Sequence, residues 1–137
     1  MEIKVLLIGV VIKDKYILMR KKPDGSLPYK ETWYIFGAEA TSNEPPEVIL
    51  TNHIKKTTGV DTAVTERLSW YTEIKRDLDG TEKLFFYLNS LCEYEAGEPK
   101  ISEGIERLEW IPISELKNYD IVPPSRTLFT KLGYLSE

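Results

Sequence analysis

A single amphipathic helix, set between two groups of strand-like segments, limits this chain to a mixed α/β fold. The pattern predicts the helix over residues 46–58, where Leu50 and Ile54 lie four residues apart on one face. Gly59 follows, and glycine commonly ends a helix in the left-handed conformation. We expect the N-cap to be one of two polar residues, Ser42 or Asn43. We expect the helix to pack on the sheet through its apolar residues, Val48, Leu50 or Ile54.

The segments on both sides of this helix have the composition of β-strands. Two apolar runs around a three-residue polar turn predict an opening hairpin, and Asp79-Gly80 is a strong turn signal for a second hairpin. The expected strands cover residues 3–12, 16–19, 33–36, 63–74, 83–91 and 106–111. Two further helices are expected over residues 114–117 and 125–132, so that residues 1–137 form one domain.

Length and composition exclude several classes of protein. The 137 residues are 42% hydrophobic, which is enough for one packed domain. The net charge of −4 does not suit a nucleic-acid-binding surface, so we expect no nucleic-acid partner. The longest apolar run, residues 5–12, is too short to span a membrane, and the first residues lack the pattern of a signal peptide. With Cys92 as the single cysteine, no internal disulfide can form, and we expect a cytoplasmic protein.

The predicted helix and the residues before it carry a recognisable pattern. From Gly37 the chain reads GAEATSNEPPEVILTNHIKKTTGV. Glu44, Ile54, Gly59 and Val60 fall on defined positions of the sequence G-x5-E-x7-R-E-U-x-E-E-x-G-U, in which U is a bulky aliphatic residue. The pattern therefore resembles the signature of the Nudix hydrolases, the MutT-like superfamily. Four of nine defined positions match, so the signature is degenerate.

The segments around the signature strengthen the resemblance. Residues 33–38, WYIFGA, keep the tryptophan, the spacing and the first glycine of the Trp-x-x-Pro-Gly-Gly sequence that precedes the signature in Nudix domains. The strand ending in Arg20-Lys21-Lys22 is similar to the family's opening hairpin, and residues 109–116 are similar to its closing strand. Because the resemblance covers nearly the whole chain, it implies a Nudix-type α/β/α sandwich with a mixed β-sheet.

The signature departs from the family at the positions that perform its chemistry. In Nudix hydrolases three clustered glutamates hold Mg²⁺ or Mn²⁺, which binds the diphosphate and activates water. Here those positions carry His53, Lys56 and Thr57, which share one helix face. Hard cations require oxygen ligands, and an ammonium about 4 Å from a divalent ion costs about 8 kcal/mol at an effective dielectric constant of ~20. We therefore expect no metal at this face and no bound cofactor.

Basic residues offer another way to hold a phosphate. Lysines of the helix, together with the basic end of the hairpin at Lys21 and Lys22, are predicted to form a cationic wall at the cleft. The entry to the signature, Gly37-Ala38, adds two further positions. The candidate ligand-binding residues are Arg20, Gly37, Ala38, His53, Lys55 and Lys56. The alternative interpretation is a solvated helix face, with His53 as an ordinary surface residue.

Three acidic residues are weaker candidates for catalysis. Glu44 is the one acid of the signature that stays in place, although a carboxylate near a helix N-terminus is also explained by the helix dipole. Glu98 and Glu103 lie in acidic segments near the end of the chain. They belong either to a rebuilt active site or to ordinary solvated loops.

Two functions remain open. In the first, the domain keeps the cleft, has lost metal-dependent hydrolysis, and binds a nucleotide or another phosphorylated small molecule, so that it is inactive or weak as a pyrophosphohydrolase. In the second, it is an active hydrolase of a nucleoside diphosphate derivative that holds Mg²⁺ or Mn²⁺ with non-standard ligands. The sequence leaves open which ligand binds, which aromatic residues line the cleft, and whether two copies form a homodimer.

Overall fold

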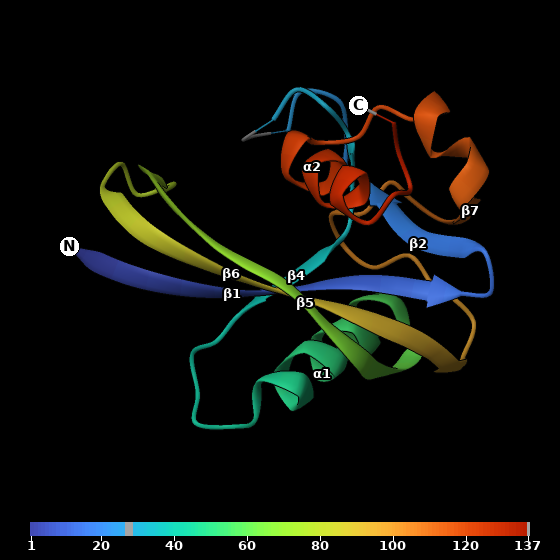
Figure 1. Cartoon of the computed structure of the whole chain (residues 1–137), viewed down its shortest axis with the longest axis horizontal. Helices are drawn as coiled ribbons and strands as arrows, with labels where there is room; N and C mark the ends of the chain where they lie inside the picture. The colour runs from blue at the N-terminus through green and yellow to red at the C-terminus, as the bar shows by residue number, and fades with distance from the viewer. Residues whose placement is uncertain (27–28, 137) are drawn as a thin grey trace.

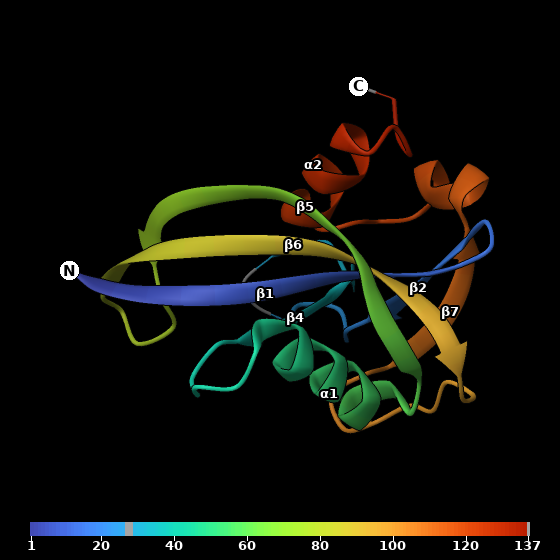
Figure 2. The same ribbon diagram turned by 60° about the horizontal axis from the view of Figure 1, so that its bottom comes forward.

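A mixed β-sheet lies between two helices in the computed structural model, which describes residues 1–26 and 29–136 and contains seven strands within them (Figure 1). Helix α1 (Pro46–Thr58) covers one face of the sheet, and helix α2 (Pro123–Lys131) covers the other (Figure 2). The strands are β1 (Glu2–Lys13), β2 (Tyr16–Lys21), β3 (Trp33–Tyr34), β4 (Phe36–Glu39), β5 (Asp61–Arg76), β6 (Glu82–Ala96) and β7 (Arg107–Pro112). The predicted α/β/α sandwich with a mixed sheet is confirmed.

Strand β1 is the centre of this sheet. It pairs in parallel with β6 from Glu2 opposite Lys83 to Ile12 opposite Glu93. Its other edge is shared by two antiparallel partners, β4 beside residues 6–9 and β2 beside residues 11–13. Strands β3 and β7 pair with β2, and β5 pairs with β6 at the far edge. The sheet therefore divides at β1, where its partner changes from β4 to β2.

Alternating side chains along β1 and β2 fill two separate cores. Val10 and Ile17 face α2 and pack in the cluster that contains its Leu128 and Phe129. The next residues along the chain point the opposite way and pack in the cluster that contains Leu50 and Ile54 of α1: these are Val11 and Leu18. This period of two is what a strand buried on both faces requires.

Helix α1 has the predicted bounds, and Gly59 ends it with φ of 81° in the left-handed conformation. Leu50 and Ile54 are buried, so the predicted packing of the helix on the sheet is confirmed through these two residues, whereas Val48 is 39% exposed. Val48 lies two residues from Leu50, which places it on another side of the helix. The predicted cap is wrong, because Pro45 occupies the N-cap position and no side chain caps the helix.

Other boundaries differ from the prediction by a few residues. The expected strand over residues 33–36 is interrupted at Ile35 and forms β3 and β4, which pair with different strands. The short helix after β7 is the 3₁₀ helix η1 (Ile113–Asn118). The hairpin turn predicted at Asp79-Gly80 is confirmed between β5 and β6, with Gly80 at φ of 86°. Within the described residues, no helix has the length and apolar character needed to cross a membrane.

The packing of α1 predicts unequal effects of two aliphatic substitutions. Ile54 is fully buried, so Ile54→Ala should lower the free energy of unfolding by about 2–5 kcal/mol, through lost burial and the cavity it leaves. Val48→Ala should change it by less than about 0.5 kcal/mol, because that side chain already contacts solvent. Urea denaturation followed by circular dichroism measures both. Equal losses would contradict the orientation of α1.

Candidate functional site

His53 is half-buried on α1, and its Nε2 atom is enclosed by protein without a hydrogen-bond partner in the described structure. Burial lowers the pKa of the imidazole, and the positive charges of Arg20 and Lys56 lower it further. His53 is therefore neutral at physiological pH and lies within electrostatic reach of two cations. The alternative of an ordinary surface histidine does not describe this environment.

Arg20 reaches this region from β2, and its position is held by aromatic rings and a backbone contact. Its Nε donates a hydrogen bond to the carbonyl oxygen of Ile35 at 3.3 Å. The guanidinium carbon lies 4.2 Å from the centre of the Tyr34 ring and 5.0 Å from that of Phe36. Burial lowers the pKa of the guanidinium, which remains a cation at any physiological pH. Arg20 is thus a partly desolvated, pre-positioned charge of the kind that binds phosphate strongly.

The other cations of the predicted wall are engaged elsewhere. Lys55 pairs with Asp61 at 3.1 Å. Lys21 pairs with Asp24 at 3.2 Å and with Glu106 at 3.1 Å. The wall therefore does not include them as free charges, and Lys56 is the exposed helix lysine left near His53.

Lys22 has a structural role instead. It is 7% exposed, and its Nζ donates hydrogen bonds to the carbonyl oxygens of Ser26 at 3.0 Å and Tyr29 at 2.8 Å. A buried ammonium with carbonyl partners stabilises the loop after β2. Two cations therefore remain near the neutral His53: Arg20 and Lys56. We call these three residues the cationic cluster.

The residues at the signature positions do not fit a divalent metal ion. The Thr57 hydroxyl donates a hydrogen bond to the carbonyl oxygen of His53 at 2.8 Å, so it is turned back onto its own helix. Glu44 is exposed, and its carboxylate and backbone N–H both contact the Ser42 hydroxyl at 3.3 Å. Across residues 1–26 and 29–136, no three His, Cys, Asp or Glu side chains gather as a metal site requires. An imidazole, an ammonium and a back-bonded hydroxyl cannot replace three carboxylates around Mg²⁺.

Glu98 and Glu103 are both exposed, and their surroundings differ. The backbone carbonyl of Glu98 lies against Gly59, where the loop after β6 passes the C-terminal end of α1. Lys100 secures this approach, since its N–H donates to the carbonyl oxygen of Thr58 at 2.8 Å. Glu103 lies in a turn before β7, and no ion pair or hydrogen bond of its carboxylate is formed within the described part of the chain. The fold therefore brings the backbone of Glu98 to the end of α1.

Gly37 and Ala38 lie in β4, opposite Ile8 and Leu7 of β1. A Cβ atom at Gly37 would lie 3.0 Å from Cδ1 of Ile8, so a larger residue there would require this side chain to shift. Gly37 also lines a pocket of about 200 Å³ together with Arg20, so the two residues share one cavity.

This cavity, which we call the tyrosine pocket, is aromatic and carries positive charge. The rings of Tyr71 and Tyr87 stack with their centres 4.4 Å apart, and the Tyr87 hydroxyl contacts the Glu73 carboxylate at 3.1 Å. Burial and this carboxylate raise the pKa of Tyr87, so its hydroxyl stays protonated. The pocket lining includes Arg20, Tyr29, Tyr34, Tyr71, Lys75 and Tyr87. The sequence did not identify these tyrosines as a group, because Tyr71 and Tyr87 meet only through the register of β5 with β6, and Tyr29 and Tyr34 come from other segments.

The buried imidazole predicts a pH-dependent stability. The folded state lowers the pKa of His53 below 6.5. The unfolded chain therefore binds a proton at this imidazole at a higher pH than the folded chain does. The stability of the wild type relative to a His53→Gln variant should therefore fall as pH drops below 6.5 and stay constant above it. Thermal unfolding of both proteins from pH 8 to pH 5 measures this difference. A difference independent of pH would contradict the enclosed position of the ring.

Comparisons with known proteins agree with this architecture. No protein-family model and no curated protein matches the chain. Among solved structures, the MutT Nudix hydrolase from Burkholderia pseudomallei matches with a TM-score of 0.74 and 19% identity, over 93% of this chain and 95% of that one. The Nudix hydrolase from Nitrosomonas europaea gives 0.72 and 15%, over 96% and 89%. A UDP-X diphosphatase gives 0.65 and 16%, over 98% and 66%.

Proposed function

We propose that this chain, which has the fold of the Nudix hydrolases, binds a nucleotide or another phosphorylated small molecule without a metal ion and hydrolyses it weakly or not at all. The observation that carries this proposal is the cationic cluster. Arg20 and Lys56 both act electrostatically on His53, at a helix face where the Nudix signature has carboxylates. A site of this charge attracts phosphate and repels Mg²⁺.

The tyrosine pocket supports a ligand that carries a ring as well as a phosphate. A planar base that stacks on aromatic side chains gains about 1–3 kcal/mol per ring. Arg20 lines this pocket and also belongs to the cationic cluster, so one ligand can contact both regions. A nucleotide has this combination of a planar ring and a charged group, and the UDP-X diphosphatase of the same fold is named for a nucleotide substrate.

The charges of the site argue against efficient hydrolysis. A coordinated divalent ion lowers the pKa of its bound water and stabilises the charge that develops on the phosphoryl oxygens. Arg20 and Lys56 can supply part of the second effect, because they are cations beside the expected phosphate. Neither can supply the first. We therefore expect binding to survive the loss of the metal ligands and turnover to fall to near background.

The alternative, an active hydrolase with non-standard ligands, has one structural feature in its favour. Glu98 lies beside the end of α1, in a loop held there by the Lys100 backbone. Its carboxylate is exposed and stands without two further acidic ligands in the described structure. We therefore prefer metal-free binding and treat metal-dependent turnover as the outcome that would overturn it.

Two neighbouring lysines of α1 provide a matched test of phosphate binding. In buffer with a chelator, Lys56→Gln should weaken the binding of ADP by about fivefold, because a partly screened cation near the phosphate is lost. Lys55→Gln should change it by less than about twofold, because Lys55 is paired with Asp61. Calorimetric titration at low and high salt measures the affinities, and wild-type affinity should fall with salt. Equal effects of the two substitutions would contradict the cationic cluster.

Restoring the carboxylates tests why the metal is expected to be absent. The triple change His53→Glu, Lys56→Glu and Thr57→Glu should create a stoichiometric Mg²⁺ site that calorimetry detects, whereas the wild type should show none. A panel of nucleoside diphosphate derivatives with Mg²⁺ and Mn²⁺ should give near-background pyrophosphohydrolase activity for the wild type. Rapid metal-dependent turnover by the wild type would establish the alternative function instead.

A further inference from the structure

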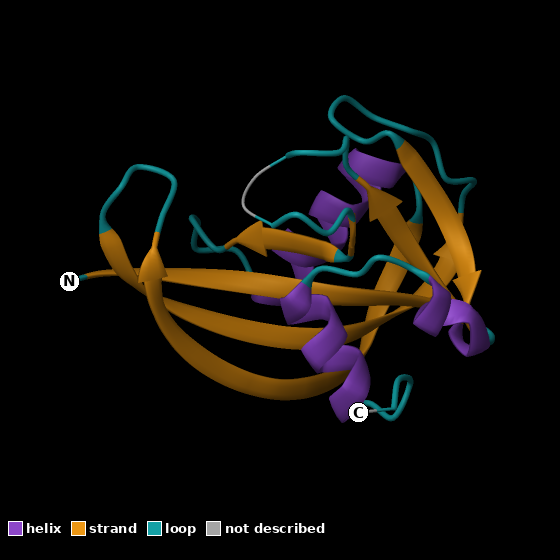
Figure 3. Ribbon diagram, turned by 90° about the horizontal axis from the view of Figure 1, so that it is seen from above, coloured by secondary structure: helices purple, strands orange, loops and turns teal. Residues whose placement is uncertain are grey.

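Strands β1, β5 and β6 extend beyond both helices as a long arm (Figures 1 and 3). Strand β5 forms the outer edge of this arm, since among the described residues it pairs with β6 alone. The pairing of β5 with β6 is irregular at three places before Trp70 and regular over residues 70–76. A regular edge strand presents a row of unpaired backbone N–H and C=O groups to any chain that approaches it.

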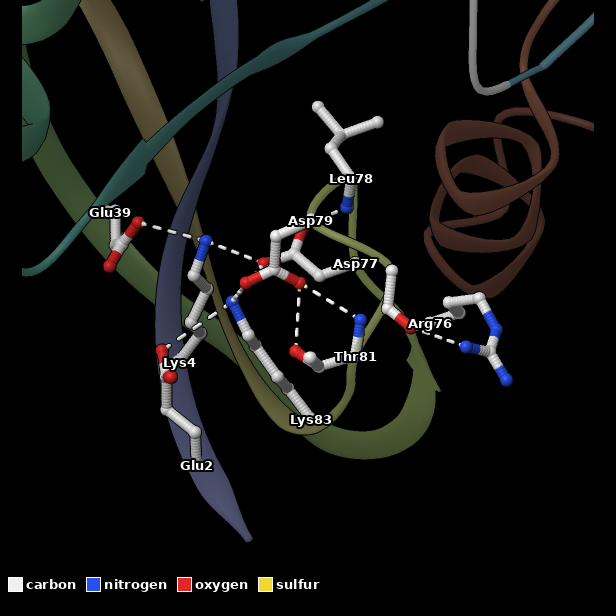
Figure 4. Close-up of polar contacts among 10 residues, drawn as sticks. Glu2, Lys4, Glu39, Arg76, Asp77, Leu78, Asp79, Thr81 and Lys83 are labelled. Atoms are coloured by element: carbon white, nitrogen blue, oxygen red, sulfur yellow. Dashed lines mark hydrogen bonds and ion pairs between the residues drawn. The ribbon is translucent and has the colours of Figure 1, made fainter.

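A network of ion pairs around the buried Lys83 connects the turn at the end of the arm to β1 (Figure 4). Lys83 is 4% exposed, and its Nζ lies 2.8 Å from both Asp77 and Asp79 of the turn. Lys4 of β1 contacts Asp77 at 2.7 Å and Glu39 of β4 at 3.6 Å. Hydrogen bonds from Lys4 and Lys83 hold the pKa of Asp77 well below its usual range. The network ties β1, β4 and the turn together next to the free edge of β5.

The side chains along this edge combine apolar and charged groups in a regular order. Trp70 and Ile74 lie on one face of β5 and are 70% and 58% exposed. Glu73 and Lys75 lie on the other face, with their charged groups 3.6 Å apart. Residues 70–76 have no bulge to interrupt pairing, and the edge carries the charged residues Glu73, Lys75 and Arg76, which a partner strand must match.

We propose that this edge pairs with the same edge of a second copy of the chain, in antiparallel orientation and centred on Ile74. In this register residue i lies opposite residue 148 − i of the other copy. Ile74 then faces Ile74, and each Glu73 faces Lys75 of the other copy. The paired segment covers residues 72–76, and Leu78, which is 85% exposed, lies beyond it in the turn. The two-fold symmetry gives the Glu73–Lys75 pair twice, whereas the Ile74–Ile74 pair lies on the axis and occurs once.

Registers centred on Thr72, Glu73, Ile74 or Lys75 all place corresponding faces of the two strands on the same side of the sheet. Charge complementarity selects the register centred on Ile74. Centring the pair on Glu73 would place two glutamates opposite each other, and centring it on Lys75 would oppose two lysines. Like charges directly opposite each other destabilise a β-sheet. Centring it on Thr72 would place Glu73 opposite Tyr71 and lose both ion pairs. Among these four registers, only the one centred on Ile74 both places apolar side chains opposite each other and forms the two ion pairs.

Cysteine cross-linking tests the pairing and its register together. Directly opposite residues of an antiparallel pair have Cα atoms about 4.5–5.5 Å apart, within the range that a disulfide spans. Ile74→Cys should therefore form a covalent dimer under mild oxidation. Thr72→Cys is the matched control on the same face, and its two copies would lie about 13 Å apart along the strands. The native Cys92 is fully buried and does not compete.

Non-reducing electrophoresis should show a dimer for Ile74→Cys and a monomer for Thr72→Cys. Equal cross-linking of both variants would indicate random collision and overturn the proposal. Cross-linking of Thr72→Cys alone would overturn the register. A wild type that stays monomeric by light scattering at all concentrations, with no cross-link in either variant, would overturn the interface itself.

Charge reversal gives a second test that does not use cysteine. Glu73→Lys opposes lysines across the interface, and Lys75→Glu opposes glutamates, so each variant alone should dimerise about tenfold more weakly than the wild type. Mixing the two variants restores both ion pairs, and a heterodimer should form with an affinity within about threefold of the wild-type dimer. Thermal unfolding confirms that each variant is folded. Variants that dimerise as the wild type does when separate, or folded variants that fail to associate when mixed, would contradict the proposed pairing.

Discussion

The burial of both faces of β1 is the constraint on which the rest of the molecule depends. Its alternating side chains supply one core beneath α1 and another beneath α2, while its backbone pairs with β6 from Glu2 to Ile12. Helices on opposite faces are therefore attached to the same strand. Along β1 the partner strand changes from β4 to β2. This change brings the two sides of the candidate site together, because Arg20 of β2 and Gly37 of β4 line the same pocket.

A change of charge on one helix face does not have to disturb the core beneath that helix. The packing side of α1, with Leu50 and Ile54, is that of an ordinary buried helix. On another side of this helix, the Nudix signature has carboxylates that bind a divalent ion. Here that side carries His53 and Lys56, near Arg20. Because packing and charge lie on different sides of the helix, the fold tolerates this replacement without losing its core.

The sequence predicted the parts of the fold that depend on local periodicity. The bounds of α1, its end at Gly59, the burial of Leu50 and Ile54 and the turn at Asp79-Gly80 are all confirmed. The resemblance to the Nudix signature predicted the same α/β/α sandwich that the solved structures share. Boundaries were less accurate where tertiary pairing decides them, as at Ile35, where one expected strand serves two different neighbours.

Sequence alone determined which chemical groups occupy the signature positions, since the type and spacing of residues on a helix place His53, Lys56 and Thr57 on one face. Only the tertiary structure decided which cations remain near that face. Lys21 is drawn to Glu106, which is 85 residues away in the chain, and Lys55 to Asp61 on the next strand. The physical reason is that ion pairing and desolvation depend on distances through space, which local periodicity does not contain.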